Sequence, residues 1–188
     1  MSLPEIKVVG AILLVIVAFS LWNFRLANIR ARDIQRKNDL KHIKAAVDNY
    51  AKEVGLLPTS KDNKILACDP RVISQESSPS GNQEIEFKPC DWGLDKIVNP
   101  YTEAAFIDGL PIDPLSSEGR AYVYLSNGRN YQLLASLEQK NEAEYNKGVA
   151  QRNLLCGDKT CNFAVGSSNN LPLDKSIEEI EQERSSSP

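Results

Sequence analysis

The chain has 188 residues, of which 41% are apolar, and a formal net charge of −3. This length accommodates one globular domain with an anchor and a tail, and the near-neutral charge gives no indication of a nucleic-acid or acidic partner. The apolar residues are concentrated at the N-terminus, whereas the chain after about residue 25 has the composition of a soluble protein.

The segment from Val8 to Trp22 contains no charged residue. With its flanks it extends over about 22 residues, or roughly 33 Å of α-helix, which matches the hydrocarbon core of a bilayer. The sequence therefore predicts a membrane span. A carboxylate in lipid is costly, so Glu5 either lies in the headgroup layer or has a partner. A cleaved signal peptide is the alternative, although residues 18–20 form a poor cleavage site and the helical pattern continues beyond them.

Beyond Phe24, apolar residues recur mostly at steps of three or four, which predicts one face of a helix. Gly55 can cap this helix and Pro58 prevents its resumption, so one helix from about residue 4 to 54 is expected, roughly 75 Å long. Its apolar stripe must be covered by a downstream domain. The stripe comprises Leu26, Ile29, Ile34, Leu40, Ile43, Val47, Tyr50 and Val54.

Basic residues fill the spaces between the apolar positions of this helix. Acidic residues interrupt them and no aromatic residues alternate with them, which favours a solvated face over a phosphate-binding surface. The basic residues are Arg30, Arg32, Arg36, Lys37, Lys41 and Lys44, and the acidic ones are Asp33, Asp39 and Asp48.

The four cysteines, Cys68, Cys90, Cys156 and Cys161, lie in loop-like segments after the apolar block. An even count favours two disulfides in an oxidising compartment. Three pairings exist, of which Cys68–Cys90 with Cys156–Cys161 closes the most local loops. A zinc site is the rival interpretation, but no C-x2-C spacing occurs and His42 is the single histidine. Positive charges after the span favour a cytoplasmic C-terminal side, whereas the cysteines favour the opposite side, and we give the cysteines more weight.

Two β-rich runs, Ala121–Ser126 and Arg129–Leu137, flank Asn127-Gly128, a pair that favours a type I′ hairpin turn. Short strands are expected at residues 110–112 and 162–165, and residues 56–100 are expected to be mostly connection. The sequence thus predicts an α+β fold in which a small antiparallel sheet packs on a long N-terminal helix.

The stretch Leu3–Asp33 resembles the N-terminal helix of type IV pilins and type II secretion pseudopilins. Glu5, the Asn23-Phe24 pair and the run Arg30–Asp33 fall in register with that family when Met1 is the first mature residue. Further resemblance lies in the helix exit with Pro58-Thr59, in the Asp113-Pro114 pair, and in the tyrosine-rich runs at 122–124 and 131–133, which are similar to the major pseudopilin group. The resemblance covers about residues 1–138.

This resemblance implies a structural subunit of a pilus-like or secretion filament, with Glu5 neutralising the N-terminal amine of Met1 on a neighbouring copy. The implied partners are other copies, other pilins, assembly-platform membrane proteins and the membrane, with no nucleic acid. The implied location is the cytoplasmic membrane, with the C-terminal domain outside the cytoplasm and in a filament when assembled. The alternative is a non-polymerising bitopic membrane protein whose outer domain binds a ligand or partner.

Residues 1–25 are expected to form the membrane half of the helix, 26–55 its amphipathic half, 56–166 the globular domain and 167–188 a disordered acidic tail with a transient helix at residues 174–184. Asp108, Asp113 and Glu118 are calcium candidates, because some pseudopilins bind calcium in a nearby loop, but no D-x-D-x-D-G series is present. No cofactor and no enzymatic activity are expected, since no nucleophile–base motif occurs.

Overall fold

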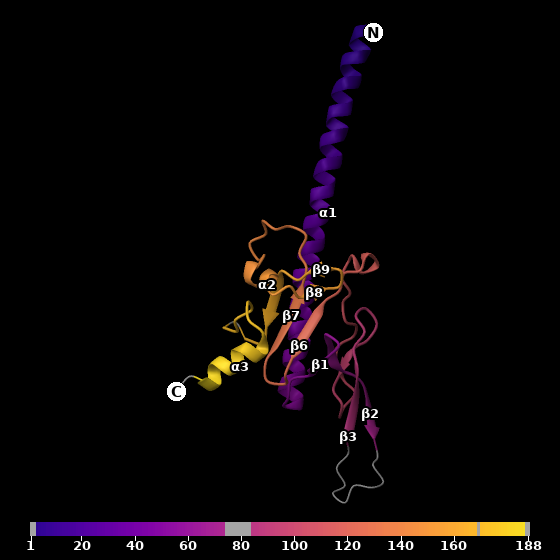
Figure 1. Ribbon diagram of the computed structural model, residues 1–188. Coiled ribbons are helices and arrows are strands. Elements are labelled where there is room, and N and C mark those ends of the chain that lie inside the picture. Colours follow the sequence, from indigo (N-terminus) through magenta and orange to yellow (C-terminus); the bar gives the residue numbers. More distant parts are fainter. Residues whose placement is uncertain (1–2, 74–83, 169, 187–188) are drawn as a thin grey trace, which may run out of the picture.

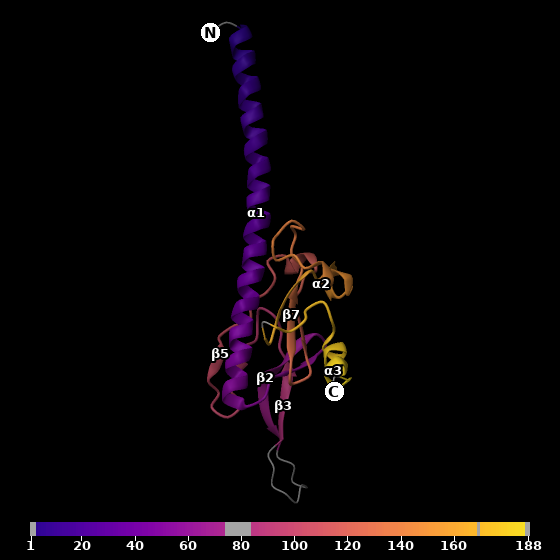
Figure 2. The ribbon, with the colours of Figure 1, turned by 90° about the vertical axis from the view of Figure 1, so that its left-hand side faces the viewer.

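The computed structural model describes residues 3–73, 84–168 and 170–186 (Figure 1). One long helix, α1 (Leu3–Val54), runs through the molecule, and a small domain packs on its C-terminal half while the N-terminal half projects away (Figures 1 and 2). At 1.5 Å per residue, its 52 residues span roughly 78 Å. The predicted α+β fold, a long helix followed by small antiparallel sheets, is confirmed.

The end of α1 follows from the residues at its C-terminus. Gly55 has a φ of +86°, a left-handed conformation that glycine adopts without steric cost, and its N–H donates to the Ala51 carbonyl at 3.0 Å. Pro58 follows three residues later and cannot continue a helix. The predicted end of the helix at residue 54 is confirmed.

The first sheet has the order β1–β2–β3, all antiparallel, with β1 at Thr59–Lys61, β2 at Lys64–Ile73 and β3 at Glu84–Pro89. β1 and β2 are joined by a two-residue loop, Asp62-Asn63, in which both residues have positive φ, as a type I′ turn requires. The expectation that residues 56–100 are mostly connection was wrong for this part. β1 is only three residues long, and the longer β2 has register shifts between Leu66 and Arg71, which break the alternation that marks a strand in a sequence.

The second sheet has the order β10–β7–β6, also antiparallel, with β6 at Val123–Ser126, β7 at Tyr131–Ala135 and β10 at Phe163–Gly166. The predicted hairpin and the strand near residue 163 are confirmed, but the predicted type I′ turn is wrong. Ser126 pairs with Tyr131, so the loop has four residues, and of Asn127 and Gly128 only Gly128 has a positive φ. The Asn127 side chain accepts the backbone N–H groups of Arg129 and Asn130, which stabilises this longer loop.

Short elements complete the domain. β4 (Ile97–Val98) pairs with β5 (Ala105–Ile107), and β8 (Leu155–Cys156) pairs with β9 (Lys159–Thr160). A 3₁₀ turn, η1, covers Ser116–Glu118, and a one-turn helix, α2, covers Lys147–Gln151. Residues 110–112 form no strand, contrary to expectation, and the short strand in this region is β5.

The core lies between α1 and the two sheets. Leu40, Ile43 and Val47 on α1 are fully buried against tyrosines of the second sheet and its approach. Each buried aliphatic side chain of this size contributes about 1.5–3 kcal/mol relative to exposure. The aromatic partners are Tyr122, Tyr124 and Tyr131, and the hydroxyl of Tyr124 donates to the Pro58 carbonyl at 2.8 Å.

The C-terminal segment is packed on the domain, which differs from the disordered tail expected from its composition. Helix α3 (Ile177–Ser186) buries Ile177 and Ile180. Its first turn has a capping box, in which the Ser176 hydroxyl accepts the Glu179 N–H at 3.2 Å and the Glu179 carboxylate accepts the Ser176 N–H at 2.7 Å. The sequence predicted a transient helix at residues 174–184, but it did not predict that this helix packs on the domain, because a few apolar residues at helical spacing are enough to dock a segment that is otherwise polar.

Candidate functional site

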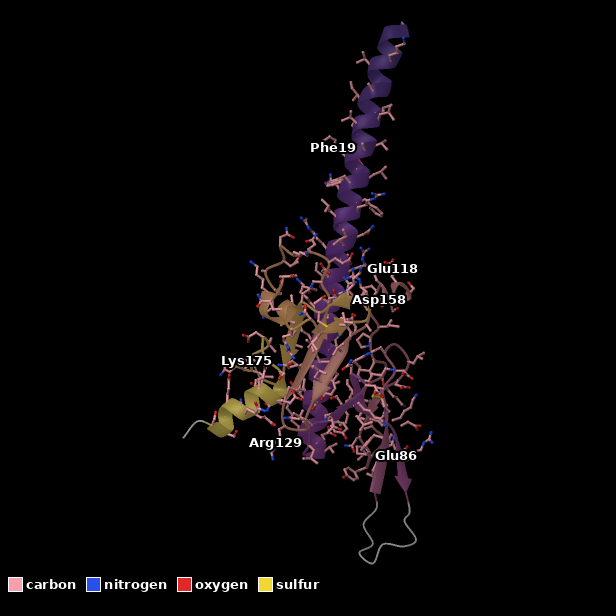
Figure 3. All side chains as sticks on the ribbon, viewed as in Figure 1. Phe19, Glu86, Glu118, Arg129, Asp158 and Lys175 are labelled. Atoms are coloured by element: carbon pink, nitrogen blue, oxygen red, sulfur yellow. A yellow bond between two sulfur atoms is a disulfide. The ribbon has the colours of Figure 1, made fainter. Side chains whose placement is uncertain are left out.

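The N-terminal half of α1 is an exposed apolar surface. The described large side chains of Val8–Phe24, here called the apolar segment, are all more than half exposed, and Leu14, Phe19 and Trp22 reach 73%, 68% and 65%. Figure 3 shows Phe19 on the part of α1 that projects beyond the edge of the domain. A surface this apolar is stable in water only when covered.

The apolar segment satisfies its polar groups internally. Its backbone N–H and C=O groups are paired within α1, and the Ser20 hydroxyl donates to the Ile16 carbonyl at 2.8 Å. In lipid every backbone polar group must have a hydrogen-bond partner within the protein, and a helix provides these partners by itself. Within the described residues, α1 is one helix long and apolar enough to cross a membrane, and none of its apolar window is buried in the domain.

A buried ion-pair cluster fixes α1 to the domain just beyond the apolar segment. Arg36, fully buried, donates in bidentate fashion to Asp113, from Nε at 2.8 Å and from Nη2 at 3.0 Å. Its Nη1 donates to Asp33 and to Glu138, both at 2.8 Å. Arg32 makes a second bidentate pair with Glu138, at 2.7 and 2.8 Å. These five residues, Arg32, Asp33, Arg36, Asp113 and Glu138, are here called the ion-pair cluster.

The cluster holds three carboxylates against two guanidinium groups, and backbone donors offset the remaining negative charge. Asp33 accepts the N–H groups of Glu138 and Gln139 at 2.9–3.1 Å, and Asp113 accepts the N–H of Leu115 at 2.8 Å. Buried charges are tolerated when each is paired and fully hydrogen-bonded. No described side chain has a buried nitrogen or oxygen atom without a hydrogen-bond partner, so the cluster meets this condition.

Hydrogen bonds within the cluster shift the pKa values of Glu138 and Arg36 towards the charged forms. Burial opposes ionisation of Glu138, but hydrogen bonds from Arg32 and Arg36 outweigh it and lower the Glu138 pKa to about 2. Burial likewise opposes the charge on Arg36, yet its bonds to Asp113 and Glu138 raise the Arg36 pKa further above its usual value.

Two tyrosines tie the helix to the second sheet farther along. The Tyr122 hydroxyl donates to Asp39 and the Tyr131 hydroxyl donates to Asp48, each at 2.6 Å. Burial and these carboxylates raise the pKa of both phenols, so both remain donors. Lys44 pairs with Asp48 at 3.0 Å. The helix and the domain are therefore joined along their whole contact.

The expected solvated basic face is wrong for its central members. Asp33 and Arg36 are fully exposed in an isolated helix but fully buried here, whereas Ile34, expected on the apolar stripe, is 52% exposed. A step of four residues back from Leu40 reaches Arg36, and a further step of three reaches Asp33, so the buried stripe continues in phase but becomes charged. That phase was the sequence signal for these residues, and it was missed because the stripe was defined by apolar residues alone.

The cysteines form the two disulfides that local loop closure favours, Cys68–Cys90 and Cys156–Cys161. The first ties β2 to the end of β3 and the second closes the β8–β9 turn. In the chain-entropy relation, sequence separations of 22 and 5 correspond to about 3 and about 2 kcal/mol of stabilisation. No free cysteine remains.

The other predicted site residues are placed as follows. Met1 and the side chain of Glu5 lie outside what the structure describes. Asp113 is bound to Arg36 in the ion-pair cluster, which leaves its carboxylate no role as a calcium ligand, and Glu118 lies in η1. Asp108 lines a different surface hollow, together with Asp95 and Glu103. Among the described residues, no group of three or more His, Cys, Asp and Glu side chains is arranged to hold a metal ion.

Comparisons with known proteins give no relative for this chain. No protein family matches it. No curated protein and no solved structure matches it either. The geometry of the apolar segment, the ion-pair cluster and the domain is therefore the basis for a function.

Proposed function

We propose that this chain is a membrane-anchored structural subunit that assembles into a filament through the apolar segment of α1, in the manner of type IV pilins and pseudopilins. One observation carries the proposal: a single helix whose first half is apolar and exposed continues without interruption into a half that is bound to a folded domain. Such a helix can lie in lipid before assembly and pack against other copies afterwards.

The firm attachment of the domain supports this role. In a filament subunit, the position of the helix must determine the position of the domain that is displayed on the filament. A flexible connection between the two would not maintain that relation. The ion-pair cluster and the tyrosine–aspartate bonds provide a joint with fixed geometry.

The proposed orientation places the domain outside the cytoplasm, since both disulfides are stable in an oxidising compartment. In the filament, the carboxylate of Glu5 would neutralise the N-terminal amine of the next copy, because a carboxylate among apolar helices needs a partner. The role is structural, not catalytic, and other pilins and membrane assembly proteins would supply the machinery.

The alternative is a bitopic membrane protein that does not polymerise and whose domain binds a ligand or another protein. It requires the same exposed apolar segment but no carboxylate partner at Glu5. The two functions therefore differ in their dependence on Glu5.

The test compares the wild-type chain with Glu5→Ala and with Glu86→Ala, expressed in the native host. Glu86 is an exposed carboxylate on β3, far from the apolar segment (Figure 3), and its replacement is the matched control. Filaments sheared from cells and the remaining membranes are each measured by immunoblotting and electron microscopy. We expect wild-type and Glu86→Ala chains in both fractions, and Glu5→Ala in the membranes alone.

Filaments of normal number and length from Glu5→Ala would contradict the proposed role of this carboxylate. A wild-type chain that never enters the sheared fraction, and is a monomer or dimer in mild detergent, would support the non-polymerising alternative.

A further inference from the structure

Two adjoining grooves lie on the domain where α1 leaves the apolar segment. The first, of about 580 Å³, includes Ile29 of α1 in its wall. The second, of about 560 Å³, shares Lys140, Tyr145, Ala150 and Asn153 with the first. Together they are here called the basic groove.

The charge on the basic groove is strongly positive. Four cationic side chains line it, and the one carboxylate among its lining residues, Glu138, is already bound to Arg32 and Arg36. The three lysines are exposed, and the arginine is positioned by a bond from Nη1 to the Ser136 carbonyl at 3.1 Å. The four cations are Arg120, Lys140, Lys147 and Lys159.

Neighbouring carboxylates do not neutralise these cations from within the groove. Glu142 and Glu144 bind Lys37 at 3.0 and 3.1 Å. Glu118 and Asp158, labelled at the same end of the domain in Figure 3, are not among the residues that line either groove.

The position of the groove along α1 is fixed by the helix. Ile29 lies five residues beyond Phe24, the last apolar residue before Arg25, which corresponds to about 7–8 Å at 1.5 Å per residue. The headgroup layer adds roughly 5–8 Å on each side of the hydrocarbon core. Figures 1 and 2 show the loop between β7 and α2 rising beside α1 at this end of the domain. When the apolar segment is in a bilayer, the basic groove is therefore level with the headgroups.

We propose that the basic groove docks onto the phosphate groups of anionic phospholipids while the subunit is in the membrane. Lys140, Lys147 and Lys159 contact lipid phosphates, and Arg25 and Arg30, both exposed on α1, add to the positive charge beside them. Tyr145 is half-buried and has the amphipathic ring that favours the interface.

The lipid surface is a better occupant than a free anion for a physical reason. Anchoring by α1 holds the groove beside a dense layer of phosphates, so each contact forms at a high effective concentration. Each basic side chain near an anionic surface strengthens binding about fivefold. This inference depends on membrane insertion of the apolar segment but not on filament formation.

The experiment uses the full chain in nanodiscs of phosphatidylcholine, with or without phosphatidylglycerol. Amide hydrogen exchange is measured for residues 138–160, which include the loops of the groove. We expect at least fivefold slower exchange in the discs that contain phosphatidylglycerol, and we expect added salt to remove the effect because screening weakens it.

The variant K140Q/K147Q/K159Q should lose this protection, since three charges at about fivefold each correspond to roughly a hundredfold weaker docking. The control, K52Q/K61Q/K96Q, removes the same charge from exposed lysines that do not line the basic groove, and it should behave as the wild type.

Equal exchange of the wild type in both kinds of disc would overturn the proposal. Protection produced by inorganic phosphate in phosphatidylcholine discs would also overturn it, by showing a free-anion site. Loss of protection in the control would likewise overturn it, by showing that the net charge of the chain, and not the groove, determines the protection. Copurification of the chain with the discs reports insertion separately, and failure there would count against the membrane anchor itself.

Discussion

Arg36 shows how a charged side chain can occupy a core position. Its guanidinium is fully buried, yet each of its bonds ends on a carboxylate, and two of those carboxylates, Asp33 and Asp113, also receive backbone donors. The planar fork of arginine suits this arrangement, because it binds one carboxylate in bidentate fashion and still offers Nη1 to two others. A lysine at this position could not reproduce that geometry.

Removal of Arg36 should therefore strongly destabilise the domain. Arg36→Met leaves Asp33 and Asp113 buried without a cation, and we expect a loss of about 3–5 kcal/mol in the free energy of unfolding. Arg71→Met is the matched control, because the Arg71 side chain is 74% exposed and its pair with Asp69 should contribute less than about 1 kcal/mol. Urea unfolding in detergent micelles measures both, and similar losses for the two variants would contradict this account.

Acid should weaken the same cluster through Glu138. Its folded-state pKa of about 2 lies below the ordinary value of 4.5, so its carboxylate stabilises the fold above pH 4.5. That contribution, about 3 kcal/mol, is lost as the pH falls from 4.5 towards 2. The difference in free energy of unfolding between wild type and Glu138→Gln should therefore shrink over this range. A difference that stays constant with pH would show that Glu138 carries no such charge-dependent stabilisation.

At the scale of elements, short segments obtain their stability from contacts with the domain. Helix α3 has ten residues, too few to be stable alone in water, and its first half is fixed by the burial of Ile177 and Ile180. Before it, the buried Gln132 of β7 donates to the carbonyls of Pro172 and Lys175 at 3.1 and 2.9 Å. Arg152 donates to Gln132 and to the Leu173 carbonyl at 2.8 and 2.9 Å. The C-terminal segment thereby covers the face of the second sheet opposite α1.

This packing predicts that an apolar residue of α3 contributes to global stability. Ile180 is 3% exposed, and Ile180→Ala should lower the free energy of unfolding by about 2–4 kcal/mol. Gln182→Ala, an exposed position of the same helix, should change it by less than about 0.5 kcal/mol. Denaturant titration distinguishes the two cases, and an equally small effect of Ile180→Ala would return the segment to the disordered state expected from composition.

At the scale of the whole molecule, α1 serves two environments in sequence. Its described residues up to Phe24 contribute nothing to the core, whereas Leu40, Ile43 and Val47 form the centre of it. Between these parts the ion-pair cluster marks the beginning of the domain. The stability of the folded domain therefore depends on the second half of α1, whereas the burial of the apolar segment depends on its surroundings outside the domain.

This separation predicts the behaviour of a shortened chain. A chain of residues 25–188 should be a soluble monomer whose free energy of unfolding lies within about 0.5 kcal/mol of that of the full chain in detergent, because the removed residues whose side chains the structure describes are exposed. Analytical ultracentrifugation and denaturant titration check the two parts of this expectation. Oligomers of the shortened chain, or a large loss of stability, would show that the apolar segment also supports the domain.

The sequence by itself determined the features that depend on neighbouring residues. The apolar run, the helical period and the Gly55–Pro58 exit predicted α1 to within one residue at each end, because helix geometry and capping are local. The even cysteine count and local spacing favoured the observed disulfides, and the β-rich runs on either side of Asn127-Gly128 predicted the hairpin.

The tertiary structure alone decided features that join distant residues. Asp33, Arg36, Asp113 and Glu138 form one cluster across separations of up to 105 residues, and no local pattern pairs a particular carboxylate with a particular guanidinium. The docking of α3 and the gathering of four cations in the basic groove likewise depend on contacts between residues that are far apart in the sequence. A charged residue is solvated unless the fold brings it a partner, and that partner depends on which surfaces pack together.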